Sequence, residues 1–179
     1  MVCTTLVMRS NDEKFDRIYQ RAEELKMTSL FHLGIVGRYK ETDPYRINSN
    51  CMRPIYLDTI ARVFPKLTII GAHLGNPWYE EATMSARWNP SLYFDLSGST
   101  LKKKTSEFLR SLLWWTPDTR YRDPEGRYAW EKIVFGSDVP YNEIEDVLND
   151  YKTVMKKLDL PAKIREKVFG KTMEKILKI

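Results

Sequence analysis

The stretch Lys132-Ile133-Val134-Phe135-Gly136-Ser137-Asp138-Val139-Pro140 carries the strongest fold signal in this chain. An apolar run leads into Gly-Ser and is followed at once by a carboxylate and a proline. We expect the apolar run to be a buried strand that ends just before Asp138. Because parallel α/β folds gather functional side chains at the carboxyl ends of their strands, Asp138 is a candidate functional residue.

The two histidines of the chain follow apolar runs of the same kind. His32 comes directly after Ser29-Leu30-Phe31, and His73 comes after the run from Leu67 to Ala72. Three predicted strands therefore end in a side chain that can bind a metal or transfer a proton.

Strand and helix signals alternate along the chain. Apolar and β-branched runs predict strands at 2–8, 28–31, 67–72, 92–96 and 133–136. Helical spacing of apolar residues, with caps and prolines at the ends, predicts helices near 12–25, 54–64, 77–88, 103–115, 143–157, 161–169 and 172–177. Long polar connections are expected at 37–50 and 116–127, and the first is a candidate substrate loop. Strands that alternate with helices pair in parallel, so we expect an α/β fold in one domain over residues 1–179.

The length of the chain limits its architecture. It has 179 residues, whereas a complete (β/α)8 barrel takes about 250 and rarely fewer than about 200. A complete barrel is therefore excluded, and a partial one is expected.

Composition argues against several classes of partner. The net charge of +5 comes largely from lysines near the C-terminus, which we interpret as a solvated helix face. A nucleic-acid surface needs basic residues interleaved with aromatics on one face, so no nucleic-acid partner is expected. Strongly salt-dependent binding to unrelated DNA duplexes would be the evidence for one. No long apolar run or signal-peptide pattern occurs, so we expect no membrane span and a cytoplasmic location. Cys3 and Cys51 lack metal-binding spacing and are expected to be reduced thiols.

The strand-end residues have the chemistry of a metal site. Imidazole and carboxylate groups are common ligands of Zn²⁺ and similar ions, so His32 and Asp138 are candidate ligands. His73 is a candidate third ligand or a general base. The residues alone leave plainer interpretations open, because a histidine at a strand end is often structural and Asp after Gly-Ser is often a turn former.

No nucleotide-binding motif is present, because the glycines form neither GxGxxG nor a P-loop. Asp95 or Ser97, at the end of the strand predicted at 92–96, could approach a ligand. Asp95 would lie inside that strand, so a structural hydrogen bond to its carboxylate is at least as good an interpretation.

Taken together, these motifs resemble the amidohydrolase-related, metal-dependent TIM-barrel hydrolases and decarboxylases, the group that includes aminocarboxymuconate semialdehyde decarboxylase. The segments that carry the resemblance occur in the family's order and cover most of the chain: 15–25, Leu30-Phe31-His32-Leu33-Gly34, Phe64-Pro65-Lys66-Leu67, Ala72-His73-Leu74-Gly75, Leu92-Tyr93-Phe94-Asp95-Leu96-Ser97 and 133–140.

The resemblance implies a role for each candidate residue. His32 is similar to the metal-ligating histidine of the fifth barrel strand, and Asp138 to the metal-ligating aspartate of the eighth. His73 is similar to the sixth-strand histidine, which binds a second metal or serves as catalytic acid or base, and Asp138 shares that catalytic centre. Arg53 is a candidate for binding an anionic substrate, but it matches no family motif.

The chain also departs from the family pattern. The first family strand carries a His-x-His pair that supplies two metal ligands, and this sequence contains no such pair. The matching segments correspond to strands four to eight, so the expected fold is a partial (β/α) TIM-like barrel with C-terminal helices.

Two functions follow from this combination. The first is a metal-dependent hydrolase or decarboxylase that acts on a small, carboxylate-bearing substrate with a divalent metal, zinc foremost. It would be completed as a homo-oligomer or by a complementary N-terminal barrel half. The alternative is a non-catalytic remnant or fragment of the fold that serves as an assembly or binding module.

Overall fold

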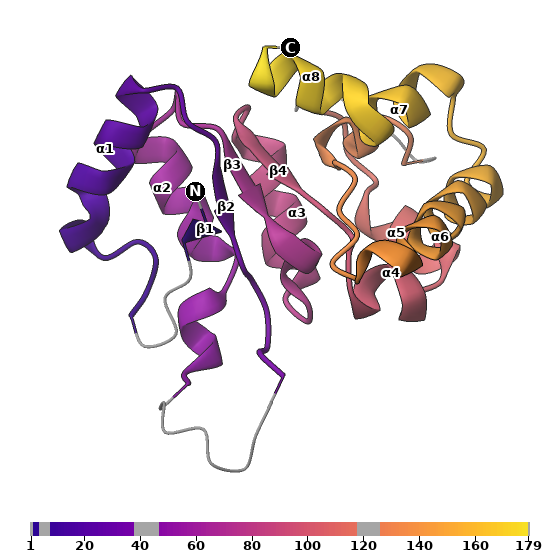
Figure 1. The fold of residues 1–179 in the computed structure, drawn as a ribbon, viewed down its shortest axis with the longest axis horizontal. Helices are drawn as coiled ribbons and strands as arrows, with labels where there is room; N and C mark the ends of the chain where they lie inside the picture. The colour runs from indigo at the N-terminus through magenta and orange to yellow at the C-terminus, as the bar shows by residue number, and fades with distance from the viewer. Residues whose placement is uncertain (1, 4–7, 38–46, 118–125, 179) are drawn as a thin grey trace.

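The computed structural model describes residues 2–3, 8–37, 47–117 and 126–178. Its sheet has four parallel strands in the order β1-β2-β3-β4, so pairing follows chain order (Figure 1). The strands are β1 (Val2–Cys3), β2 (Ser29–Phe31), β3 (Ile69–Gly71) and β4 (Leu92–Phe94). Four of the predicted strands are thereby confirmed in position and direction, although each is shorter than expected. Residues 4–7 of the first one lie outside the described residues.

The fifth predicted strand, 133–136, is largely absent. A single parallel bridge joins Ile133 to Phe94, and the amide of Val134 donates to the Phe94 carbonyl at 2.9 Å. The next amide, that of Phe135, donates instead to the Val168 carbonyl at 2.9 Å. Adjacent amides of a strand point to opposite sides, so this bond does not itself end the pairing. The ladder with β4 stops where the Leu96 amide, just beyond β4, donates to the Tyr151 hydroxyl instead of to this segment.

The helices between the strands form where the apolar spacing predicted them. Turn η1 (Glu13–Phe15) begins at Asp12, whose side chain accepts from the Lys14 amide, and leads into α1 (Asp16–Glu24). Turn η2 (Ser49–Met52) precedes α2 (Ile55–Val63), which starts after Pro54. Turn η3 (Ala72–Gly75) follows β3 and precedes α3 (Tyr79–Trp88). Helices α2 and α3 pack on each other and against β3 and β4, and α1 flanks the sheet on the left in Figure 1.

The helix predicted at 103–115 is shorter than expected, and a separate helix that was not predicted precedes it. Helix α4 (Ser99–Lys103) ends before Lys104, and α5 (Ser106–Leu112) begins after Thr105. Thr105 is extended and its side chain accepts from the Phe108 amide. Because this N-cap starts a new helix, the two helices cannot be continuous.

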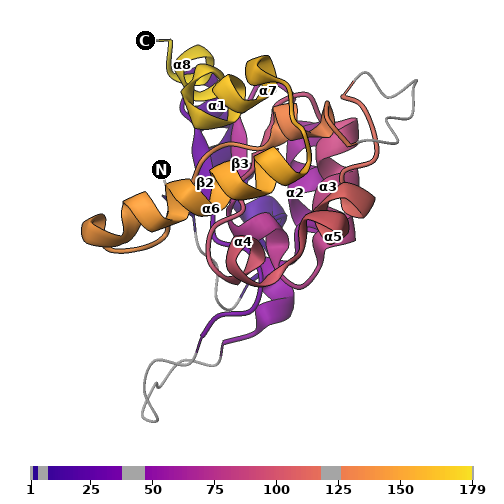
Figure 2. The same ribbon diagram turned by 90° about the vertical axis from the view of Figure 1, so that its right-hand side faces the viewer.

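Helical elements make up most of the C-terminal part. The elements there are η4 (Ala129–Lys132), η5 (Tyr141–Glu143), α6 (Ile144–Lys157), α7 (Ala162–Glu166), the π-turn η6 (Lys167–Lys171) and α8 (Thr172–Leu177). Figure 2 shows α6 crossing the side that faces the viewer, with α7 and α8 above it and α4 below. Of the two long connections, 38–46 and 118–125 lie outside the described residues.

The helix α6 is tied to the sheet through a buried tyrosine. Tyr151 is fully buried, and its hydroxyl accepts a 2.9 Å hydrogen bond from the Leu96 amide just beyond β4. Its ring packs against Phe135 and Phe169. Burial raises the pKa of Tyr151 far above its ordinary value, so the hydroxyl stays neutral. These contacts anchor the segments that carry the strand-end residues.

Across the described part of the chain, no helix combines the length and the apolar character that a membrane span requires.

Candidate active site

A cavity of about 540 Å³ opens at the carboxyl end of the parallel strands. Its walls come from the segments that follow β2, β3 and β4 and from the turn after Gly136. The lining residues are His32, Leu33, Ile35, Val36, Gly37, His73, Asn76, Gly98, Ser99 and Asp138. The three strand-end residues singled out by the sequence are therefore brought together around one cavity.

His32 directly follows β2 and faces His73. The two ring centroids are 5.0 Å apart and the ring planes meet at 68°. Burial, and next the neighbouring His73, lower the pKa of His32, so its ring is neutral at neutral pH. Its Nε2 is buried and has no hydrogen-bond partner among the described residues. A buried nitrogen without a partner is costly, so this atom is available to a ligand.

His73 lies in the turn η3, two residues beyond β3. Its backbone is left-handed, with φ 61° and ψ 17°, which is uncommon for a residue other than glycine. Neighbouring polar groups hold this conformation. The His73 amide donates to Asp95 Oδ1 at 2.9 Å, and its carbonyl accepts from Thr100 Oγ1 at 2.7 Å. Strained backbone that is held by several partners is a feature of functional sites.

Asp138 also has a left-handed backbone, with φ 49°. Its Oδ2 lies 3.9 Å from His73 Nε2, and the side chain is 63% exposed. The carboxylate therefore lies at the rim of the cavity, close to His73 but not hydrogen-bonded to it.

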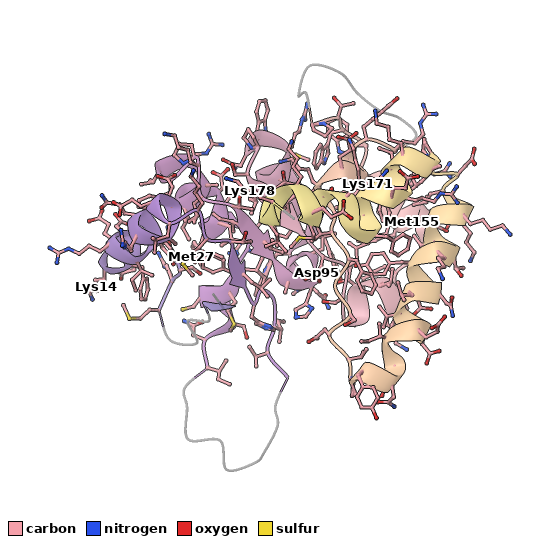
Figure 3. The ribbon with its side chains drawn as sticks, turned by 45° about the horizontal axis from the view of Figure 1, so that its top comes forward. Lys14, Met27, Asp95, Met155, Lys171 and Lys178 are labelled. Atoms are coloured by element: carbon pink, nitrogen blue, oxygen red, sulfur yellow. The ribbon has the colours of Figure 1, made fainter. Side chains whose placement is uncertain are left out.

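Asp95 and Ser97 contribute to the site in a way that the sequence only hinted at. Asp95 follows β4, and its Oδ1 accepts from the amides of His73 and Ser97, each at 2.9 Å, and from Ser97 Oγ at 2.5 Å. The structural hydrogen bonding expected of Asp95 is thus confirmed. Ser97 Oγ also lies 2.8 Å from His73 Nδ1. In Figure 3, Asp95 is labelled near the centre of the view, between the sheet and the C-terminal helices. The useful sequence signal was the Asp-x-Ser spacing at a strand end.

Arg53 is not among the residues that line the cavity. Its guanidinium forms an ion pair with Glu81 and lies 5.6 Å from the centroid of the Trp78 ring. The hydrogen bond with Glu81 raises the pKa of Arg53. Both partners hold the side chain on helix α3, and its role in substrate binding stays a prediction.

The donor groups suit a divalent metal in kind, although they do not enclose one. Two imidazoles and a carboxylate meet at the cavity, and the unpartnered His32 Nε2 is a ready ligand. Among residues 8–37, 47–117 and 126–178, however, no three His, Cys, Asp or Glu side chains are arranged to hold a metal ion as they stand. The metal-binding roles of His32, His73 and Asp138 therefore stay predictions.

The parallel sheet, its helical crossovers and a cavity at the strand carboxyl ends define part of a (β/α) barrel. Consistent with this class, the family model described as Amidohydrolase matches residues 6–179. The chain belongs to the amidohydrolase family.

Solved structures agree on the fold. An uncharacterized TIM-barrel protein from Bordetella bronchiseptica superposes with a TM-score of 0.69 at 18% identity, over 96% of this chain and 52% of that one. Dihydroorotase from Campylobacter jejuni superposes with a TM-score of 0.61 at 17% identity, over 99% of this chain and 58% of that one. An amidohydrolase from Burkholderia multivorans with bound zinc superposes with a TM-score of 0.58 at 14% identity, over 94% of this chain and 58% of that one. The chain thus spans little more than half the length of these proteins. A search of the curated proteins found no match.

Proposed function

We propose that this chain supplies part of the active site of a metal-dependent hydrolase of the amidohydrolase family. The observation that carries the proposal is the convergence of His32, His73 and Asp138 on one cavity at the strand carboxyl ends. The zinc in the Burkholderia relative supports a divalent metal, with zinc foremost. The substrate would be a small molecule, and a carboxylate on it would suit the basic balance of the chain.

Each residue has a distinct proposed role. His32, through its unpartnered Nε2, and Asp138, through its carboxylate, would hold the metal, which when bound would make water acidic and polarise a substrate carbonyl. His73, with Nε2 near Asp138, would accept or return a proton. The same proton transfer would serve decarboxylation, in which His73 would protonate the carbon that loses CO₂.

The proposed site needs ligands beyond those described. A catalytic zinc normally has three protein ligands and one open position, and the described residues do not form such a set. We therefore propose that a second copy, or a chain carrying the N-terminal barrel half, completes it. The open ligand set equally favours the alternative of a non-catalytic remnant, so zinc binding is the deciding measurement.

The test compares zinc affinity in wild type, H32Q, D138N and the control D146N, each stripped of metal and titrated against a chromophoric zinc indicator. Asp146 is an exposed carboxylate on α6, away from the cavity. We expect H32Q and D138N to weaken binding at least about tenfold, or roughly 1.4 kcal/mol, and D146N to match wild type. Equal zinc binding by all four proteins, or none by wild type, would favour the remnant.

A further inference from the structure

The Asp95–Ser97 pair has a specific relation to the His73 ring that the proposed roles do not yet use. We propose that Ser97, held by Asp95, is a positioning residue that keeps the proton of neutral His73 on Nδ1. The Nε2 atom is then the nitrogen with a free lone pair. This inference rests on the proposed function only in assigning His73 a proton-transfer role.

The number of protons that each of the three side chains can donate determines which atom is the donor in each hydrogen bond. A carboxylate oxygen only accepts hydrogen bonds, and a serine hydroxyl has one proton to donate. Ser97 Oγ lies 2.5 Å from Asp95 Oδ1, the short distance typical of a hydroxyl that donates to a carboxylate. Its proton is therefore directed at Asp95. At the 2.8 Å contact with His73 Nδ1, Ser97 Oγ must accept, so Nδ1 carries the hydrogen.

Burial and backbone bonds make this arrangement rigid. Asp95 and Ser97 are 7% and 2% exposed, so water competes little for their hydrogen bonds. The same Asp95 oxygen accepts from the His73 amide. One carboxylate therefore holds both the left-handed backbone of His73 and, through Ser97, the orientation of its ring.

The consequence is a histidine with one reactive nitrogen. With hydrogen on Nδ1, the Nε2 lone pair lies 3.9 Å from Asp138 Oδ2 at the cavity. When Nε2 accepts a proton, the imidazolium keeps its Nδ1–H bond to Ser97 and presents a new N–H beside the Asp138 carboxylate. The opposite tautomer would present a hydrogen to the cavity and could neither accept a proton nor bind a metal through Nε2.

The tautomer can be read directly, because the chain contains only two histidines. The experiment is a long-range ¹H–¹⁵N correlation spectrum of the metal-free protein near pH 8. H32Q assigns the His73 ring. We expect wild type to show the Nδ1–H pattern, S97A to lose it as the dominant form, and S97T, which keeps a hydroxyl, to restore it.

Ser99 provides the matched control. It lines the same cavity, but its Oγ accepts from Asn76 Nδ2 at 2.7 Å. S99A should therefore leave the His73 tautomer unchanged. A wild-type spectrum with hydrogen on Nε2, or an S97A spectrum that retains Nδ1–H, would overturn the inference. The wild-type spectrum is decisive even if S97A does not fold. Because the protein is metal-free, the result is independent of the zinc titration.

Discussion

Three residues show how single positions shape the cavity. His73 and Asp138 are both left-handed without being glycine, and the two side chains face each other. Gly34 has the same kind of backbone, with φ 95°, and lies between Leu33 and Ile35, which line the cavity. There the chain after β2 passes very close to the segment after β3, and the Ile35 amide donates to the Asn76 carbonyl at 3.1 Å.

Substituting Gly34 by alanine should destabilise the fold and distort the cavity. A Cβ at Gly34 would lie 2.2 Å from the Asn76 carbonyl oxygen, a backbone atom that cannot easily move, and the positive φ adds strain. We expect G34A to lower the free energy of unfolding by about 2 kcal/mol or more, measured by urea denaturation. G37A is the control, since a Cβ there meets nothing within 4 Å. Equal stability of the two variants would contradict the close approach.

At the scale of elements, Lys132 joins η4 to the start of β4. The side chain is buried, and Nζ donates to the carbonyls of Asn89 at 2.9 Å, Pro90 at 2.6 Å and Leu92 at 3.3 Å. It also lies 4.7 Å from the Tyr93 ring centroid. Burial lowers the pKa of Lys132 to about 8 from its ordinary 10.5. The bonds hold the segment before Ile133 at the amino end of β4, opposite the cavity.

This buried lysine predicts a rise in stability with pH. Between pH 8 and 10.5 the unfolded chain keeps a proton that folded Lys132 has lost, so the free energy of unfolding increases across that window. We expect a gain of about 2 kcal/mol from pH 7.5 to 9.5, measured by urea unfolding. K132M should lack this gain, while K163M, which alters an exposed lysine, should retain it. The same pH slope in wild type and K132M would contradict the prediction.

At the scale of the whole molecule, the sheet accounts for only part of a barrel. The chain spans 52% of the Bordetella TIM-barrel protein, and its described residues do not enclose a metal. If the remaining ligands come from another chain, metal binding and assembly must be linked, because a metal that binds only the assembled form stabilises that form.

Native mass spectrometry of the chain with added zinc tests that linkage. We expect stoichiometric zinc on a dimer or larger species and little on the monomer, with the metal-bound fraction rising with protein concentration. D138N should reduce both the bound zinc and the assembled fraction. A zinc-loaded monomer would show that the chain closes the site alone. A metal-free monomer at every concentration would exclude a self-sufficient enzyme and favour the non-catalytic remnant or fragment.

Much of the fold was predictable because its signals are local. The alternation of apolar runs with helical spacing located four parallel strands and most helices, and the strand-end positions of His32, His73 and Asp138 placed them at one cavity. Helix α4 was missed, and the helix at 103–115 was predicted to begin too early, although Thr105 is a good N-cap.

The sequence by itself determined the class of fold and the residue types available for chemistry. Hydrophobic periodicity and the positions of strand ends are local properties that can be read from the order of the residues. Tertiary structure alone decided that the Leu96 amide bonds to Tyr151 rather than to the fifth predicted strand, and that Ser97 contacts the His73 ring. It also placed Arg53 on Glu81 and away from the cavity lining. Each of these pairings joins residues more than 20 positions apart, so it depends on how the crossovers pack, which local pattern does not encode.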